Sequence, residues 1–121
     1  MSKDYWKGCF ISEGLKDPSI LNGFNCYKFH ITKILLEIDS NGTLGRWHMY
    51  WIEAPEDKFN IFEKNVKFSW YGHFWKGNKI IAIFEGKKFE LDKNNKETWK
   101  DAIAYGLSQN IKKEQLYFLT D

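Results

Sequence analysis

Arginine is almost missing from this 121-residue chain, since Arg46 is the single arginine among 18 basic residues. Sequence-specific reading of DNA or RNA relies on forked guanidinium groups, so the composition argues against a specific nucleic-acid partner. The other basic residues are lysines spread from Lys3 to Lys113, and the net charge is only +2. This pattern is typical of an ordinary solvated surface.

Cysteine is also scarce, and neither Cys9 nor Cys26 belongs to a C-x-x-C pair or a zinc-finger spacing. Both lie in apolar, strand-like stretches, which favours buried reduced thiols over a disulfide. No run of about 18 apolar residues is present for a membrane span, and residues 1–4 do not begin a secretion signal. We therefore expect a cytoplasmic protein with no membrane partner.

Catalytic and cofactor motifs are missing as well. The chain has no Gly-rich phosphate loop, no G-x-S-x-G and no H-E-x-x-H sequence. Its three histidines have no metal-site spacing, so we expect no metal and no cofactor. No sequence feature marks Cys9 as a nucleophile. Whether the protein is an enzyme stays open at this stage.

Aromatic residues, by contrast, are abundant at 18% of the chain, within a hydrophobic content of 43%. That content and length predict one domain over residues 1–121 with a substantial core. Strands are expected at 5–13, 25–38, 44–53, 67–76, 79–85 and 87–91, and helices at about 17–23, 56–65 and 95–108. The order β-α-β-β-α-β-β-β-α predicts an α+β fold with a mostly antiparallel sheet. Its first six elements match a ferredoxin-like order, which carries no function.

A first hairpin is predicted around an Asn41-Gly42 turn, which would place Glu37 opposite Arg46. One face would form the core and carry Ile34, Leu36, Trp47, Met49 and Trp51. The other face would be solvated and carry Lys33, Glu37, Arg46, His48 and Tyr50. On that solvated face, His48 is a candidate acid–base residue, with Arg46 and Tyr50 able to bind an anionic substrate. The alternative is a plain solvated surface. His30 and His73 are expected on core faces.

A second hairpin, turning at Gly77-Asn78, divides the aromatic segment 70–75 between two faces. The face expected to form the core carries Tyr71, His73, Trp75, Ile80, Ala82, Phe84, Phe89 and Leu91. On the opposite face, Gly72 leaves a notch between Trp70 and Phe74. Either the last helix or the tail covers this notch, with Trp99 or Tyr105 entering it, or the notch is a groove for a planar ligand or a partner chain. The apolar tail 115–119 is expected to dock on the body.

Four groups of residues stand out in the second half of the chain. They are Trp70-Tyr71-Gly72-His73-Phe74, Ile83-Phe84 with Gly86-Lys87-Lys88-Phe89, Thr98-Trp99 with Ala102-Ile103 and Tyr105-Gly106, and Glu114-Gln115-Leu116 with Phe118. Together they resemble a small prokaryotic family of uncharacterised proteins. The family has no assigned activity. The resemblance therefore implies only that this half is a coherent unit, and it assigns no catalytic residue.

The leading functional hypothesis is a small binding protein, with Trp70, Gly72 and Phe74 contacting a small molecule or a protein partner. The alternative is a hydrolase or transferase that uses His48 on an anionic substrate. A weaker third hypothesis is single-stranded nucleic acid stacked on exposed aromatic rings. The oligomeric state and the ligand are not predicted by any residue pattern.

Overall fold

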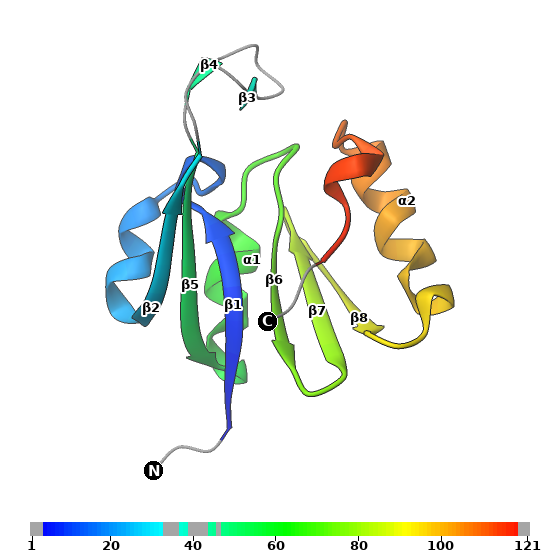
Figure 1. The fold of residues 1–121 in the computed structure, drawn as a ribbon, viewed down its shortest axis with the longest axis horizontal. Helices are drawn as coiled ribbons and strands as arrows, with labels where there is room; N and C mark the ends of the chain where they lie inside the picture. The colour runs from blue at the N-terminus through cyan, green and yellow to red at the C-terminus, as the bar shows by residue number, and fades with distance from the viewer. Residues whose placement is uncertain (1–3, 33–36, 39–43, 46, 119–121) are drawn as a thin grey trace.

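The computed structural model describes residues 4–32, 37–38, 44–45 and 47–118 (Figure 1). Its main element is a six-stranded sheet in the order β2-β5-β1-β6-β7-β8, with every neighbouring pair antiparallel. The six strands are β1 (Tyr5–Ile11), β2 (Asn25–Ile31), β5 (His48–Pro55), β6 (Gly72–Lys76), β7 (Lys79–Phe84) and β8 (Lys87–Asp92). A separate pair joins β3 (Glu37–Ile38) and β4 (Leu44–Gly45).

Two α-helices, α1 (Phe59–Asn65) and α2 (Lys100–Ser108), accompany the sheet. Short 3-10 turns are η1 (Ser12–Gly14), η2 (Pro18–Gly23), η3 (Glu56–Lys58), η4 (Lys96–Trp99) and η5 (Lys113–Gln115). The predicted α+β class is therefore confirmed. No helix in the described part of the chain is long and apolar enough to cross a membrane.

The first half of the sheet follows the split β-α-β order. The strands β2-β5-β1-β6 lie side by side, while η2 and α1 contribute Leu21 and Phe62 to one shared core. This is the strand order of the ferredoxin-like plan that the first six elements predicted. Two further hairpins add β7 and β8 beyond β6, which extends the sheet toward α2 (Figure 1).

The sheet separates two cores. One face packs against α1 and carries Phe10, Ile52 and Phe74, and we call it the α1 face. The opposite face, the α2 face, carries Trp75, Ala82 and Phe84 beneath α2 and the C-terminal segment 111–118, whose Leu116 and Phe118 are buried. The docking predicted for the tail is therefore confirmed as far as Phe118. In Figure 1, α1 lies behind the sheet, and the C-terminal segment passes in front of it.

Side-chain caps set where the helical turns begin. The Asp17 carboxylate accepts hydrogen bonds from the Ser19 amide (3.1 Å) and hydroxyl (2.6 Å), so the turn starts at Pro18 as predicted. Before α2, the capping residue is Asn95, which accepts from the Glu97 amide at 3.1 Å.

The predicted register of the first hairpin is wrong. His30, not Ile34, lies opposite Met49, and Glu37 lies opposite Gly45 rather than Arg46. The expected single strand 25–38 is two strands, β2 and β3, and β2 contains a bulge between Cys26 and Lys28. A turn fixes register only along uninterrupted strands, so these irregularities shift the pairing. Lys33, Ile34, Leu36, Arg46 and the Asn41-Gly42 turn lie outside the described residues.

The second hairpin agrees with its prediction. Trp75 lies opposite Ile80 and His73 opposite Ala82. The strands expected at 79–85 and 87–91 meet at a Glu85-Gly86 turn, which pairs Ala82 with Phe89. Both residues lie on the expected core face, and that face packs against α2.

Candidate functional site

The notch at Gly72, for which a covering element and a binding groove were the alternatives, is filled. A Cβ atom on Gly72 would collide with the ring of Phe10, and Phe74 is fully buried with its ring stacked on Phe59 at 4.1 Å. Trp70 is only 8% exposed. The covering element is α1, not the last helix, and Phe10 occupies the place expected for Trp99 or Tyr105. No local sequence pattern indicates this contact, because the β1–β6 pairing joins residues more than sixty positions apart.

His48 has a different environment from the one predicted. His48 lies on the face of β5 formed by the even-numbered residues, and this face was expected to be solvated. Ile52 and Ala54 on the same face are, however, completely buried under η2 and α1. Tyr50 packs against this core and contacts the ring of Phe29 at 4.9 Å. Arg46 lies outside the described residues, so the predicted grouping of His48 with Arg46 and Tyr50 is not described.

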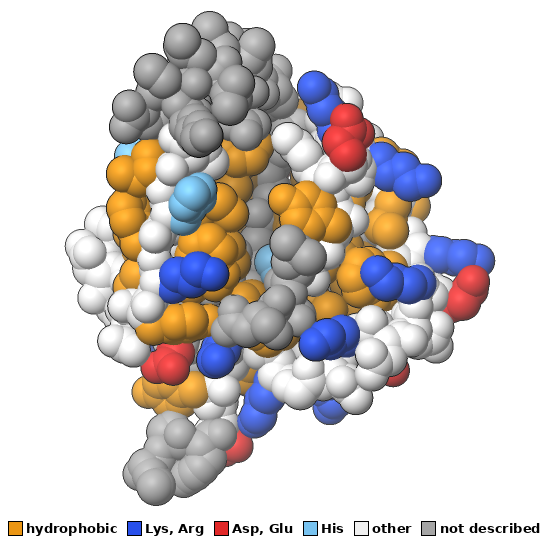
Figure 2. All heavy atoms as spheres, in the orientation of Figure 1, with side chains coloured by type: hydrophobic (Ala, Val, Ile, Leu, Met, Phe, Trp, Pro, Cys, Tyr) orange, Lys and Arg blue, Asp and Glu red, His pale blue; other side chains and the backbone are white. Residues whose placement is uncertain are grey.

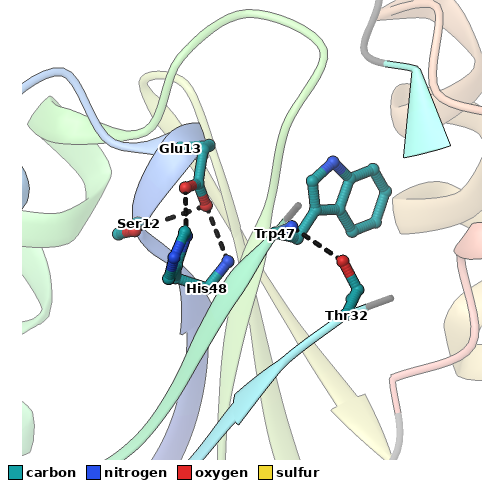
Figure 3. A network of polar contacts seen from close by, with 5 residues as sticks. All are labelled: Ser12, Glu13, Thr32, Trp47 and His48. Atoms are coloured by element: carbon teal, nitrogen blue, oxygen red, sulfur yellow. Dashed lines mark hydrogen bonds and ion pairs between the residues drawn. The ribbon is translucent and has the colours of Figure 1, made fainter. Parts of the chain in front are cut away.

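The partner of His48 is Glu13, which the sequence analysis did not identify (Figure 3). The His48 ring Nδ1 lies 2.5 Å from one Glu13 carboxylate oxygen, and the His48 amide donates to the other at 2.8 Å. Ser12 also donates to this carboxylate at 3.3 Å. Both side chains are 37% exposed. Together these bonds attach η1 to the start of β5.

A hollow lies between the α2 face of β1 and β5 and the C-terminal segment. It has a volume of about 210 Å³, and we call it the aromatic pocket. Its lining residues are Cys9, Ile11, Thr32, Trp47, Met49, Trp51, Ser69, Trp70, Tyr71, His73, Ile111, Gln115 and Tyr117. Figure 2 shows hydrophobic side chains gathered on this face over β2, β5 and β1, beside a hollow. The pocket exists because α2 covers only the β6–β8 half of this face.

Three tryptophans give the pocket its walls. The rings of Trp47 and Trp70 meet edge to face, with centroids 5.2 Å apart and planes 62° apart, and so form a corner. Trp51 is partly exposed, and the Nζ atom of Lys28 lies 4.6 Å from the centroid of its ring. Of these residues, Trp70 alone was among the predicted binding residues.

Hydrogen bonds hold the opposite wall in place. Tyr71 donates its hydroxyl proton to the Gln115 carbonyl, and Ser69 donates to the Gln109 carbonyl at 2.5 Å. Burial, together with the nearby Tyr117, raises the pKa of Tyr71 well above its usual range. The Tyr71 hydroxyl therefore remains a donor above the pH at which an exposed tyrosine loses its proton. At the far end, the Trp47 amide donates to Thr32 Oγ1 at 2.8 Å (Figure 3).

A thiol and an imidazole meet in the pocket lining. Cys9 lies opposite His73 across β1 and β6, and both side chains line the aromatic pocket. His73 is only 7% exposed, which confirms the expectation of a buried histidine. The alternation of residues along β6 predicted which face His73 occupies. Only the pairing of β1 with β6 places Cys9 beside it.

One of the two cysteines departs from expectation. Neither is part of a disulfide and Cys9 is buried, as predicted, but Cys26 is exposed on β2. Cys26 is exposed because all seven residues of β2, which lies at the sheet edge, are accessible to solvent. Within the described part of the chain, no cluster of three His, Cys, Asp or Glu residues could hold a metal ion.

The chain matches no protein-family model, no curated protein and no solved structure. Any functional assignment therefore depends on the chemistry of its own residues.

Proposed function

We propose that the protein binds a small organic molecule with a planar, largely apolar body in the aromatic pocket. The observation that carries this proposal is the partial exposure of Trp47, Met49 and Trp51. All three line a pocket with a volume of about 210 Å³. Pockets lined mainly by apolar and aromatic groups with a few polar atoms are the common form of small-molecule sites.

The size of the pocket sets the scale of the ligand. A cavity of roughly 150 Å³ is sufficient for benzene, so this pocket has room for one or two fused rings. Burying about 100–150 Å² of apolar surface gives roughly 2.5–4 kcal/mol before the cost of association. We therefore expect affinity in the millimolar range for a bare ring compound.

Polar groups on the wall would orient such a ligand. Thr32, Ser69, Gln115 and Tyr117 all contribute to the lining. Hydroxyl and amide groups at a few points among aromatic walls select for a ligand with matching hydrogen-bonding atoms at its edge. The binding hypothesis from the sequence is thus retained, but its site moves from the Gly72 notch to the opposite face.

Indole is a suitable probe because it is planar and matches the size of the pocket. We expect saturable chemical-shift changes in NMR spectra, centred on Trp47, Trp51 and Tyr71. Trp51→Ala should weaken indole binding by about tenfold, as the loss of one stacking wall implies. Tyr5→Ala is the matched control, because Tyr5 is an exposed aromatic residue that does not belong to the lining. An equal effect of the two variants would contradict the proposal.

A second candidate function uses His48, and the Glu13–His48 contact favours it. A carboxylate that holds Nδ1 fixes the orientation of an imidazole and leaves Nε2 for acid–base chemistry, as in hydrolases. Phosphate should then shift the His48 ring resonances in NMR spectra, and Glu13→Gln should weaken that response. If phosphate shifts the His48 resonances in neither the native protein nor Glu13→Gln, the Glu13–His48 contact has only a structural role.

A further inference from the structure

We propose that Cys9 and His73 form a thiol–imidazole pair that captures small, planar electrophiles covalently in the aromatic pocket. The inference rests on the proposed binding function, since the pocket must first admit the molecule. It adds a chemical reaction to binding and assigns the reacting atom as Cys9 Sγ.

The strand register places the two groups together. Cys9 on β1 lies directly opposite His73 on β6, and Trp51 on β5 lies opposite Cys9 on its other side. Side chains directly opposite one another in antiparallel strands have Cβ atoms about 4.5–5.5 Å apart. Because Cys9, His73 and Trp51 all line the pocket, a ring lying against Trp51 would be next to the thiol.

The surroundings hold the imidazole in position. The His73 ring is tilted against Trp75 with a centroid separation of 5.2 Å, and Phe118 meets it edge to face at 6.1 Å. A thiol is a weak nucleophile, and a neighbouring base that takes its proton activates it. His73 is the base best suited to do so near neutral pH.

The reaction balances without a further reactant. The Cys9 thiol passes its proton to His73, and the resulting thiolate adds to one carbon of an electron-poor C=C bond conjugated to a carbonyl. A carbon–sulfur bond forms and the carbon–carbon π bond breaks, which places the electron pair on the neighbouring carbon as an enolate. His73 then returns the proton to that carbon. The product is a thioether, and no electrons are gained or lost overall.

Cys26 provides an internal control because it is the exposed thiol of the same chain. Its Sγ contacts the Lys28 carbonyl at 3.2 Å, and it is not part of the pocket lining. Accessibility alone would make Cys26 the faster thiol. A faster Cys9 would therefore report activation and binding in the pocket.

The experiment treats the folded protein with N-ethylmaleimide and follows both cysteines by peptide mass spectrometry. We expect Cys9 to react about tenfold faster than Cys26, and the two rates to become similar in urea. N-ethylsuccinimide has the same shape but no C=C bond, so an excess of it should protect Cys9 and leave Cys26 unaffected. A Cys9 that reacts only after unfolding overturns the inference.

The role of the imidazole is tested by the pH dependence of the Cys9-to-Cys26 rate ratio. Other titratable or charged groups are Tyr71 and Tyr117 in the lining, Lys7, Lys28, His30 and Glu53 on the same sheet face, and Lys112, Lys113 and Glu114 on the C-terminal segment. The ratio should change between about pH 5.5 and 8 in the native protein and in His30→Gln, but not in His73→Gln. If the rate ratio depends on pH in the same way in His30→Gln and His73→Gln, His73 does not take part in the reaction.

The two proposals fail in different ways. If N-ethylsuccinimide shifts the NMR signals of Trp51 while Cys9 remains inert to N-ethylmaleimide, covalent capture is wrong and the binding function stands. If neither compound shifts the pocket signals and Cys9 is inert, both proposals are wrong. The rate ratio in the native protein needs no variant, so a misfolded His73→Gln protein cannot obscure the result.

Discussion

The two faces of the sheet are built from the same kinds of residue and differ in how completely they are covered. On the α1 face, Phe10 stacks on Phe62 at 4.4 Å and Phe59 on Phe74 at 4.1 Å. The α2 face holds an aromatic core over β6–β8 and a pocket over β1 and β5. The α1 face is therefore closely packed, whereas the α2 face combines a packed half with a pocket.

Glycine contributes to the density of the α1 face. A Cβ atom on Gly8 would lie 2.5 Å from the ring of Phe74, and Gly72 admits the ring of Phe10 in the same way. The absence of two side chains therefore lets two aromatic rings approach the sheet closely. The polar groups discussed above, Cys9, His73 and Tyr71, lie on the other face.

The largest effect on stability is expected from Gly72→Val, which adds a side chain to the closely packed α1 face. The new side chain must displace the Phe10 ring, which should lower the free energy of unfolding by about 1–3 kcal/mol or more. Urea unfolding followed by circular dichroism measures the change. Gly23→Ala is the control, since a Cβ atom at Gly23 meets nothing within 4 Å and should leave stability within about 0.5 kcal/mol. Equal stability of the two variants would show that the α1 face is looser than described.

A smaller effect is expected from Tyr71→Phe on the α2 face. The variant leaves the Gln115 carbonyl without its donor, which should cost about 1 kcal/mol and increase amide exchange in residues 111–118. Tyr71→Phe should also change how the free energy of unfolding depends on pH in alkaline solution. Because the pKa of Tyr71 is raised in the folded state, the unfolded chain ionises first, so the native protein loses stability as the pH rises above 10.0.

Tyr71→Phe removes this loss and should give a flatter profile above that pH. The measurement is urea unfolding at several alkaline pH values. Parallel profiles for the native protein and the variant would show that the phenol ionises without cost, and would contradict the buried donor described for the pocket wall.

Local patterns predicted the fold well where strands are continuous. The Gly77-Asn78 turn gave the correct pairing of β6 with β7, and the odd-numbered residues of the aromatic segment were correctly assigned to one core. The register failed at the first hairpin, where a bulge and a strand break interrupt the alternation that the prediction assumed. Alternation also cannot say which face is solvated when both faces of a sheet are covered.

The site was harder to predict than the fold because its residues come from five separate parts of the chain. Trp70 was singled out, but its neighbours in the pocket were not, since the pairings of β1 with β5 and β6 have no local signature. The Glu13–His48 contact was missed for the same reason. Chemistry-bearing residues could be named from the sequence, but their grouping depends on long-range strand order.

Residues 111–118 form one wall of the pocket, so ligand binding and the docking of this segment are coupled. Residues 111–118 complete the pocket only while Tyr71 and Ser69 hold the Gln115 and Gln109 carbonyls and Leu116 and Phe118 stay buried. A ligand that touches both walls stabilises this docked state by RT ln(1 + [L]/Kd), about 2.7 kcal/mol at a hundredfold excess over Kd. Slower amide exchange at the end of the chain would then report occupancy of a site on the opposite wall.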